Sequence, residues 1–386
     1  MTVTLPQGFR ASGATAGLKP SGRPDVALLV NDGPAHAAAG VFTRNKVKAA
    51  PVLWSQQVLT TGRLRAVILN SGGANACTGP EGFQTAHATA ERVAELIGCG
   101  PIEVGVCSTG IIGQQLPRDV LFAGVDAAAA ALADDDAAGL AAATAIMTTD
   151  TVPKQAAHTD PGGWRIGGFA KGAGMIAPSM ATMLAVLTTD AVVDAPVLDD
   201  ALHTAARVSF DRLDVDGSMS TNDTVLVLAS GASGVAVDPV AFTGALTAVC
   251  RDLAQQMQAD AEGVTKRVTV RCTGAATEDE AVTVARTVAR DSLVKTAMFG
   301  ADPNWGRIAA AAGYADAALD PDLLDVAING VVLCRGGVAA GDRGSVDLSG
   351  KEILVEVGLG LGEGVAEILT TDLSHGYVEE NSAYST

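Results

Sequence analysis

The sequence predicts an α/β protein, and three features carry that expectation. Its 386 residues are 48% hydrophobic and only 4% aromatic, enough apolar material for one large core or two to three domains, filled mainly by small side chains. Short apolar runs alternate with helical segments through the first hundred residues. Apolar runs return in the last third of the chain, which indicates a part rich in strands.

The first part of the chain alternates between predicted strands and predicted helices. Strands are expected at 26–30, 64–69 and 104–107, and a helix is expected at 85–97. Residues 123–147 are rich in alanine but contain three consecutive aspartates, so two surface helices with a break between them are expected there.

The rest of the chain contains further strand-like runs, which are expected at 164–169, 225–228, 268–272, 326–334, 345–348 and 353–357. The polar segment 274–280 is prone to form turns. We therefore expect a main catalytic part, 1–280, and a smaller C-terminal part, 281–386.

Charge and residue spacing exclude several classes of function. A formal net charge of -17 argues against nucleic acid or an anionic membrane as a partner. The first eight residues lack a basic region followed by an apolar one, so no secretory signal is predicted and the cytoplasm is expected. The six cysteines and five histidines are scattered without a CxxC or HExxH spacing, so no metal site is expected. No resident cofactor is expected either.

One segment, KGAGMIAPSMATML at 171–184, places a hydroxyl nucleophile near the middle of the chain. Pro178 disfavours a helix through this segment, and it also argues against a dinucleotide-binding turn at 172–177. If the chain is cut between Ala181 and Thr182, Thr182 gains an α-amine, of pKa about 7.7–8.0, that can act as the general base for its own hydroxyl. The residues alone leave open the alternative that Thr182 is an intact core residue.

Two glycine-rich loops could contribute other parts of an acyl-transfer site. The loop at 107–113 offers backbone donors for a developing oxyanion, although a simple turn capped by Thr109 explains it equally well. The loop at 70–76 has the same two readings, as a ligand-binding loop or as a plain turn. Glu262 is either a solvated charge at a helix end or a partner for a substrate ammonium group.

Seven segments follow one another along the whole chain: STGIIG at 108–113, IMTTDT at 146–151, the segment 171–184 quoted above, STNDT at 220–224, LVKTA at 293–297, DPNWGR at 302–307 and DLSHGYVEENSAYST at 372–386. Together and in this order they resemble the ornithine acetyltransferase family, which makes N-acetylglutamate in arginine biosynthesis.

This resemblance implies a layered helix-sheet-sheet-helix sandwich, shared with self-cleaving aminopeptidases, and a smaller C-terminal α/β part. It implies self-cleavage between Ala181 and Thr182, giving an α chain (1–181) and a β chain (182–386) that assemble as α2β2. Thr182 is then the nucleophile, and Thr109 and Gly110 form the oxyanion hole. The residues implied to line the substrate site are Thr148, Lys171, Thr182, Glu262, Asn381 and Thr386, of which Glu262 rests on its position alone.

The implied reaction is a ping-pong transfer of acetyl from N²-acetyl-L-ornithine to L-glutamate through acetyl-Thr182. Lys171 suits a substrate carboxylate, and Glu262 suits an ammonium group. Acetyl-CoA as a second donor would separate bifunctional from monofunctional members, and the sequence leaves this open. Two other functions also remain open: an amidase or aminopeptidase of the same architecture, and a binding protein in which Thr182 stays buried and intact.

Overall fold

The computed structural model describes residues 2–177 and 183–383, and the chain divides into two compact units. The sandwich unit holds the chain up to Asp211 together with Ser218–Met257. The C-terminal unit holds Arg212–Gly217 together with the described chain from Gln258 onward. Each unit has its own sheets and its own apolar core.

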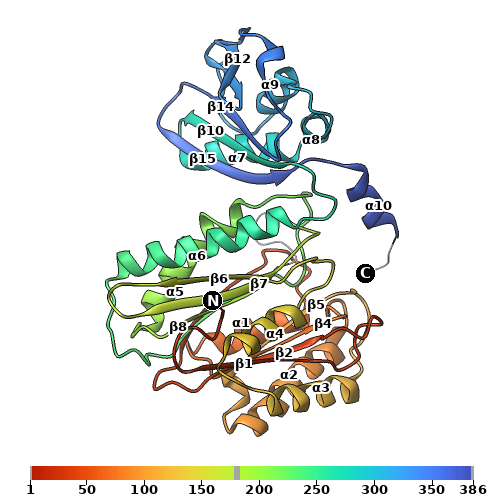
Figure 1. The fold of residues 1–386 in the computed structure, drawn as a ribbon, viewed down its shortest axis with the longest axis vertical. Coiled ribbons are helices and arrows are strands. Elements are labelled where there is room, and N and C mark those ends of the chain that lie inside the picture. Colours follow the sequence, from red (N-terminus) through yellow and green to blue (C-terminus); the bar gives the residue numbers. More distant parts are fainter. Residues whose placement is uncertain (1, 178–182, 384–386) are drawn as a thin grey trace. The chain divides into compact units, whose positions relative to one another are not determined.

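The sandwich unit contains two sheets that pack in layers (Figure 1). The four-stranded sheet has the order β1-β2-β4-β5, with bounds Phe9–Ala14, Val26–Asn31, Ala66–Ser71 and Val104–Thr109. The five-stranded sheet has the order β3-β9-β8-β7-β6, with bounds Ala37–Phe42, Thr224–Ala229, Leu184–Thr189, Arg165–Lys171 and Lys154–Thr159.

Helices cover the outer faces of both sheets (Figure 1). Those of the four-stranded sheet are α2 (Gly79–Ile97) and α3 (Arg118–Ala130), and those of the five-stranded sheet are α5 (Ala195–Arg207) and α6 (Pro239–Ala259). Two shorter helices, α1 (Ala50–Leu59) and α4 (Asp136–Ala145), contact strands of both sheets. The unit is therefore a layered α/β sandwich.

Buried side chains explain why these segments form central strands. All six residues of β2, β4, β8 and β9 are buried, and a strand buried on both faces reads as an unbroken apolar run. Leu28 and Ile68 of one sheet belong to the same core cluster as Val186 and Leu226 of the other. The two sheets therefore share one core.

The five-stranded sheet joins strands from both sides of residues 178–182. Strand β7 ends at Lys171 and pairs antiparallel with β8, with Lys171 opposite Leu184. Strand β8 in turn pairs parallel with β9, and β9 pairs antiparallel with β3. In the order β3-β9-β8-β7-β6, strands β9 and β8 follow residues 178–182 in the sequence. They lie between β3 and β7, which precede those residues.

The C-terminal unit contains one six-stranded sheet with helices packed on it (Figure 1). The order is β13-β12-β11-β14-β10-β15, with bounds Val338–Ala339, Val331–Arg335, Asp325–Ile328, Glu352–Gly358, Arg267–Ala275 and Gly364–Thr371. Its helices are α7 (Glu278–Arg290), α8 (Ser292–Phe299), α9 (Trp305–Gly313) and α10 (His375–Ala383). Among the described helices of both units, none has the length and apolar character needed to cross a membrane.

Three features of the later chain differ from the sequence-based expectations. The compact units divide at 257/258 and not near 280, because β10 pairs with β14 and β15 and so belongs to the C-terminal sheet. The single strand expected at 326–334 is interrupted at Asn329 and Gly330, both with positive φ. The strand expected at 345–348 is wrong, because a short 3-10 turn, Arg343–Ser345, occupies its start and no strand follows before β14.

Candidate active site

The predicted oxyanion residues lie where β5 ends. Thr109 is the last residue of β5 and is 1% exposed. Among the described residues its Oγ1 has no hydrogen-bond partner. A buried hydroxyl usually has one, so an unpartnered donor at a strand end is available to a ligand atom. Gly110 follows with φ +129, and an added Cβ would lie 2.6 Å from the main-chain nitrogen of Gly73.

The two glycine-rich loops predicted from the sequence, 70–76 and 108–113, lie against each other. The Gly73 N–H donates to the Thr109 carbonyl at 3.1 Å, and the Ala74 N–H donates to the Ile111 carbonyl at 2.9 Å. Asn222 reinforces this pairing, because its Nδ2 donates to the carbonyls of Ala74 and Ser108 at 2.6 and 2.8 Å. The backbone around the predicted oxyanion hole is therefore held from two other segments.

Thr148 and Lys171 lie together in a second part of the sandwich unit. The Lys171 ammonium donates to the Thr148 hydroxyl at 2.7 Å, although Lys171 is only 1% exposed. Its Nζ also lies 3.8 Å from the Asp150 carboxylate. The sequence-based prediction that these two residues share a site thus has a geometric basis, while their role in binding substrate stays a prediction.

Asp150 is the centre of a buried charge cluster. It pairs with Lys154 at 2.7 Å, and it accepts hydrogen bonds from the main-chain N–H groups of Thr148 and Gly172 at 3.0 and 2.7 Å. Burial alone would raise the pKa of the Asp150 carboxyl, but the charges of Lys171 and Lys154 and these hydrogen bonds hold it well below its usual range.

Asp223 fixes the backbone immediately after the predicted nucleophile. Its Oδ1 accepts a hydrogen bond from the Met183 N–H at 3.2 Å, and the Thr224 N–H donates to the Met183 carbonyl at 3.1 Å. Asp223 is fully buried, and this burial raises the pKa of its carboxyl well above the usual value. Residue 183 therefore has a defined position at the entry to β8.

Glu262 and Asn381 lie together in the C-terminal unit. The Asn381 side chain donates from Nδ2 to Glu262 Oε2 at 2.8 Å and to the Tyr377 carbonyl at 3.0 Å. Glu262 is 6% exposed, although it sits in a turn after α6. The hydrogen bond joins a residue of this turn to one near the end of the chain. The sequence-based choice of Glu262 rested on its position alone, and the structure places it next to another predicted site residue.

The remaining predicted site residues are Ala181, Thr182 and Thr386, which lie outside the described residues. The cleavage position and the nucleophile therefore stay predictions.

Sequence reasoning missed four polar residues that shape these clusters. Asp150, Asn222 and Asp223 lie inside the segments 146–151 and 220–224, so those matching segments carried a usable signal. Lys154 lies outside every matching segment, and only the structure shows that its ammonium group pairs with Asp150, four residues earlier in the chain. In the parts of the chain described, no group of three or more His, Cys, Asp or Glu side chains is arranged to hold a metal ion.

Comparison with known proteins identifies the family. The ArgJ family model matches residues 10–386. The arginine biosynthesis bifunctional protein ArgJ of Mycolicibacterium paratuberculosis is 63% identical over 100% of this chain and 96% of its own length. The protein of the same name from Streptomyces coelicolor is 57% identical over the full length of both chains.

Among solved structures, ornithine acetyltransferase from Mycobacterium tuberculosis in complex with ornithine is 62% identical. That similarity covers 46% of this chain and 94% of the solved chain, with a TM-score of 0.46. The family match over residues 10–386 and the identities of 57% and 63% over all of this chain lead to one conclusion. This chain belongs to the ArgJ family and is an enzyme of arginine biosynthesis.

Proposed function

We propose that the enzyme transfers an acetyl group from N²-acetyl-L-ornithine to L-glutamate through an acetyl-Thr182 intermediate. The observation that carries the proposal is the buried, unpartnered hydroxyl of Thr109 beside Gly110 at the end of β5. The names of the relatives add support, since one solved relative is called an ornithine acetyltransferase.

In the first half-reaction, the α-amine of Thr182 removes the proton of its own hydroxyl, and Oγ attacks the acetyl carbonyl. The Thr109 hydroxyl and the Gly110 N–H donate to the oxyanion that forms. When the carbon–nitrogen bond breaks, the α-ammonium group returns the proton to the amine of ornithine. The acetyl group is then an ester on Thr182.

In the second half-reaction, the amine of glutamate attacks this ester, and the Thr182 α-amine carries the released proton to the departing Oγ. Transfer to glutamate instead of water requires an oriented amine, and such orientation can lower a barrier by about 7 kcal/mol or more. The Lys171 ammonium, which donates to the Thr148 hydroxyl, suits a substrate α-carboxylate. Glu262, beside Asn381, suits a substrate ammonium group.

Self-cleavage uses the same nucleophile. Thr182 Oγ attacks the Ala181 carbonyl, the peptide nitrogen leaves as the α-amine of Thr182, and water then opens the ester. The five-stranded sheet supports the idea that the two products stay together, because β8 and β9 from one product would hydrogen-bond to β7 and β3 of the other. We propose that this cleaved pair assembles as α2β2 in the cytoplasm.

A second acetyl donor, acetyl-CoA, belongs to the proposal because the relatives that match over the full length are called bifunctional. One assay tests both donors. The enzyme is incubated with acetylornithine or with acetyl-CoA, with and without glutamate, and N-acetylglutamate and free ornithine are measured. We expect N-acetylglutamate from either donor. Release of ornithine at one rate regardless of glutamate, without N-acetylglutamate, would show a hydrolase instead.

Removal of the Thr109 hydroxyl should slow the chemical step. We expect Thr109→Ala to lower kcat by about 10²–10³, with a much smaller change in KM, because an oxyanion donor acts mainly in the transition state. Thr109→Ser keeps the hydroxyl and serves as the matched control. Steady-state kinetics on both variants check this, and an unchanged kcat in Thr109→Ala would remove Thr109 from the oxyanion hole.

Removal of the Lys171 charge should weaken substrate binding. We expect Lys171→Met to raise KM for both acetylornithine and glutamate by about tenfold to a hundredfold, because a hydrogen bond to a charged group contributes about 1.5–3 kcal/mol. Lys154 remains beside Asp150 in this variant, so the carboxylate keeps a partner. Lys46→Met, at an exposed position, is the control. A rise in KM for only one substrate would show that the two carboxylates bind at different places.

A further inference from the structure

Helix α10, at the C-terminal end of the described chain, has no apolar face with which to anchor itself. None of its nine residues is buried, and Val378 is 59% exposed. A nine-residue helix is marginal on its own, and most helices depend on burial of an apolar stripe. Other contacts must therefore determine where α10 lies on the C-terminal unit.

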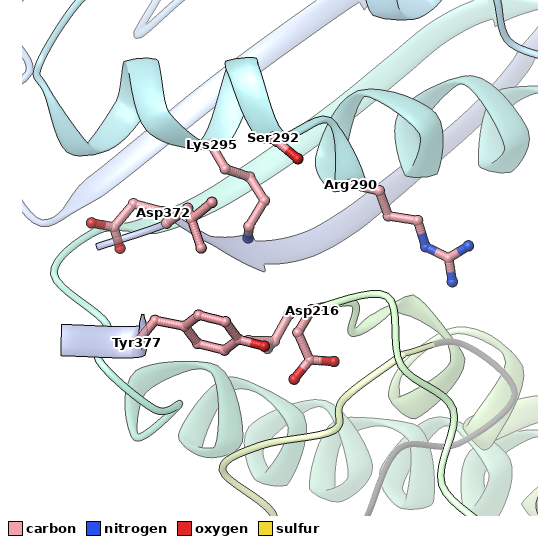
Figure 2. Close-up of a pocket in the computed structure, with 8 residues that line it drawn as sticks. Asp216, Arg290, Ser292, Lys295, Asp372 and Tyr377 are labelled. Carbon is pink, nitrogen blue, oxygen red and sulfur yellow. The ribbon is translucent and has the colours of Figure 1, made fainter. Parts of the chain in front are cut away.

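Tyr377 of α10 faces a cavity, so its ring does not fix the helix by close packing. The cavity has a volume of about 100 Å³, and Figure 2 shows Tyr377 directed across it toward Asp216. Burial, followed by the nearby charges of Asp216 and Glu262, raises the pKa of the Tyr377 hydroxyl to about 12. The ring thus borders open space over part of its surface.

The charged side chains around this cavity are already engaged. Lys295 donates to the Thr370 hydroxyl at 3.1 Å and to the Thr371 carbonyl, and burial lowers its pKa to about 8. Arg290 is paired with Asp214 at 2.6 Å. These two cations are therefore not available to a ligand in the cavity. The cavity shows instead that the Tyr377 side chain of α10 is not fully packed.

Hydrogen bonds to the turn at 263–266 hold the start of α10, together with an edge-on contact between the rings of His375 and Phe299. Asp372 accepts hydrogen bonds from the N–H groups of Thr265 and Lys266 at 3.0 and 2.9 Å, and from the Thr265 hydroxyl. Ser374 donates from its hydroxyl to the Gly263 carbonyl at 2.5 Å. The same hydroxyl accepts from the Tyr377 N–H at 3.1 Å, which is the geometry of a helix N-cap.

Gly263 allows the two backbones to touch. Its φ is +63, and an added Cβ would lie 2.0 Å from the main-chain nitrogen of Tyr377 and 2.6 Å from the carbonyl carbon of Gly376. Neither atom belongs to a flexible side chain, so a larger residue at 263 would have to displace the start of α10. Only glycine fits this approach without a shift.

The close backbone approach at Gly263 determines where the Asn381 amide lies. Glu262 directly precedes Gly263, and Asn381 lies one helical turn beyond Tyr377, whose carbonyl accepts from its Nδ2. Seating α10 on the turn therefore brings the amide to the Glu262 carboxylate at 2.8 Å. We propose that Gly263, Ser374 and Asp372 are positioning residues that seat α10 and thereby set the Glu262–Asn381 pair for substrate binding. This inference rests on the proposed function, which gives Glu262 and Asn381 their substrate role.

The test compares Gly263→Ala with Gly98→Ala in otherwise full-length enzyme. Gly98 has a similar φ of +72 but nothing within 4 Å of an added Cβ, so it carries the backbone strain without the close approach. We expect Gly263→Ala to complete self-cleavage, to lose hydrogen-exchange protection at 375–383, and to raise KM for acetylornithine and glutamate. The loss in kcat/KM should be about tenfold to a hundredfold, since a small misplacement in a site can cost about 10². Gly98→Ala should match the wild type in all three measurements.

A second pair of variants covers the case in which Gly263→Ala fails to fold. Ser374→Ala removes only the capping hydroxyl and should give the same changes at smaller amplitude, and Ser374→Thr, which keeps the hydroxyl, should restore protection and KM. Unchanged protection at 375–383 in Ser374→Ala and in any folded Gly263→Ala would overturn the seating role. Lost protection with unchanged KM would overturn the link to substrate binding. If the wild type itself transfers no acetyl group, the proposed function fails, while hydrogen exchange still decides whether α10 is seated by these residues.

Discussion

Replacement of Thr182 by alanine is expected to leave one chain of 38.8 kDa that transfers no acetyl group. The hydroxyl is needed twice, first to attack the Ala181 carbonyl and then to carry the acetyl group, and the α-amine that serves as its base appears only after cleavage. Thr182→Ala should therefore lose both self-cleavage and acetyl transfer. No other single substitution is expected to have so large an effect.

Intact mass under denaturing conditions measures this directly. The wild type should give fragments of about 18 and 21 kDa in proportion to chain length, with the second beginning at Thr182 and so carrying the free α-amine. Thr182→Ser keeps a hydroxyl nucleophile and should still be cleaved, more slowly. A Thr182→Ala protein found in two pieces would refute the assignment of both the nucleophile and the self-cleavage.

The largest expected loss of stability comes from Asp150→Ala. Asp150 is 3% exposed and is the counter-ion of two buried ammonium groups, those of Lys154 at 2.7 Å and Lys171 at 3.8 Å. Removing it leaves two like charges buried together, and breaking such a pair costs about 3–5 kcal/mol in the free energy of unfolding. It also removes the acceptor for the main-chain N–H of Gly172.

The matched control is Asp32→Ala, which breaks an ion pair of similar length, Arg10–Asp32 at 2.6 Å, at 41% and 38% side-chain exposure. An exposed pair contributes about 1 kcal/mol or less, so this change should be small. Both variants are compared by urea denaturation in the Thr182→Ala background, so that the state of cleavage is the same. Equal midpoints for the two would show that the Asp150 charge is not needed to hold the lysines.

Local sequence patterns predicted many elements of the fold because their signals are local. The break between two helices at 134–136 is confirmed: α3 ends at Ala130, and α4 begins at Asp136 after Asp135, whose side chain accepts from the Ala138 N–H. The strands at 26–30 and 104–107 are likewise confirmed as β2 and β5. The strand predicted at 345–348 does not form, because the Asp342 side chain organises a turn just before it.

The candidate site was less predictable because its clusters depend on pairings between distant segments. Thr148 and Lys171 were named only through the family resemblance, and the residues alone explained Thr109 equally well as the cap of a simple turn. Lys171 lies beside Asp150 and Lys154 where β6 pairs with β7, with Lys154 opposite Ala170, the neighbour of Lys171. The meeting of Glu262 with Asn381 depends on the close backbone approach at Gly263, which no local pattern indicates.

If the chain is cut as proposed, the strand order β3-β9-β8-β7-β6 affects how the processed enzyme unfolds. Before the cut, folding is a unimolecular reaction of one chain. Afterwards the same ladder of hydrogen bonds joins two molecules, so unfolding releases two species and the midpoint of denaturation rises with protein concentration. Refolding from denaturant becomes second order. An enzyme that has processed itself can therefore lose, on dilution after denaturation, a native state that its uncut precursor would regain alone.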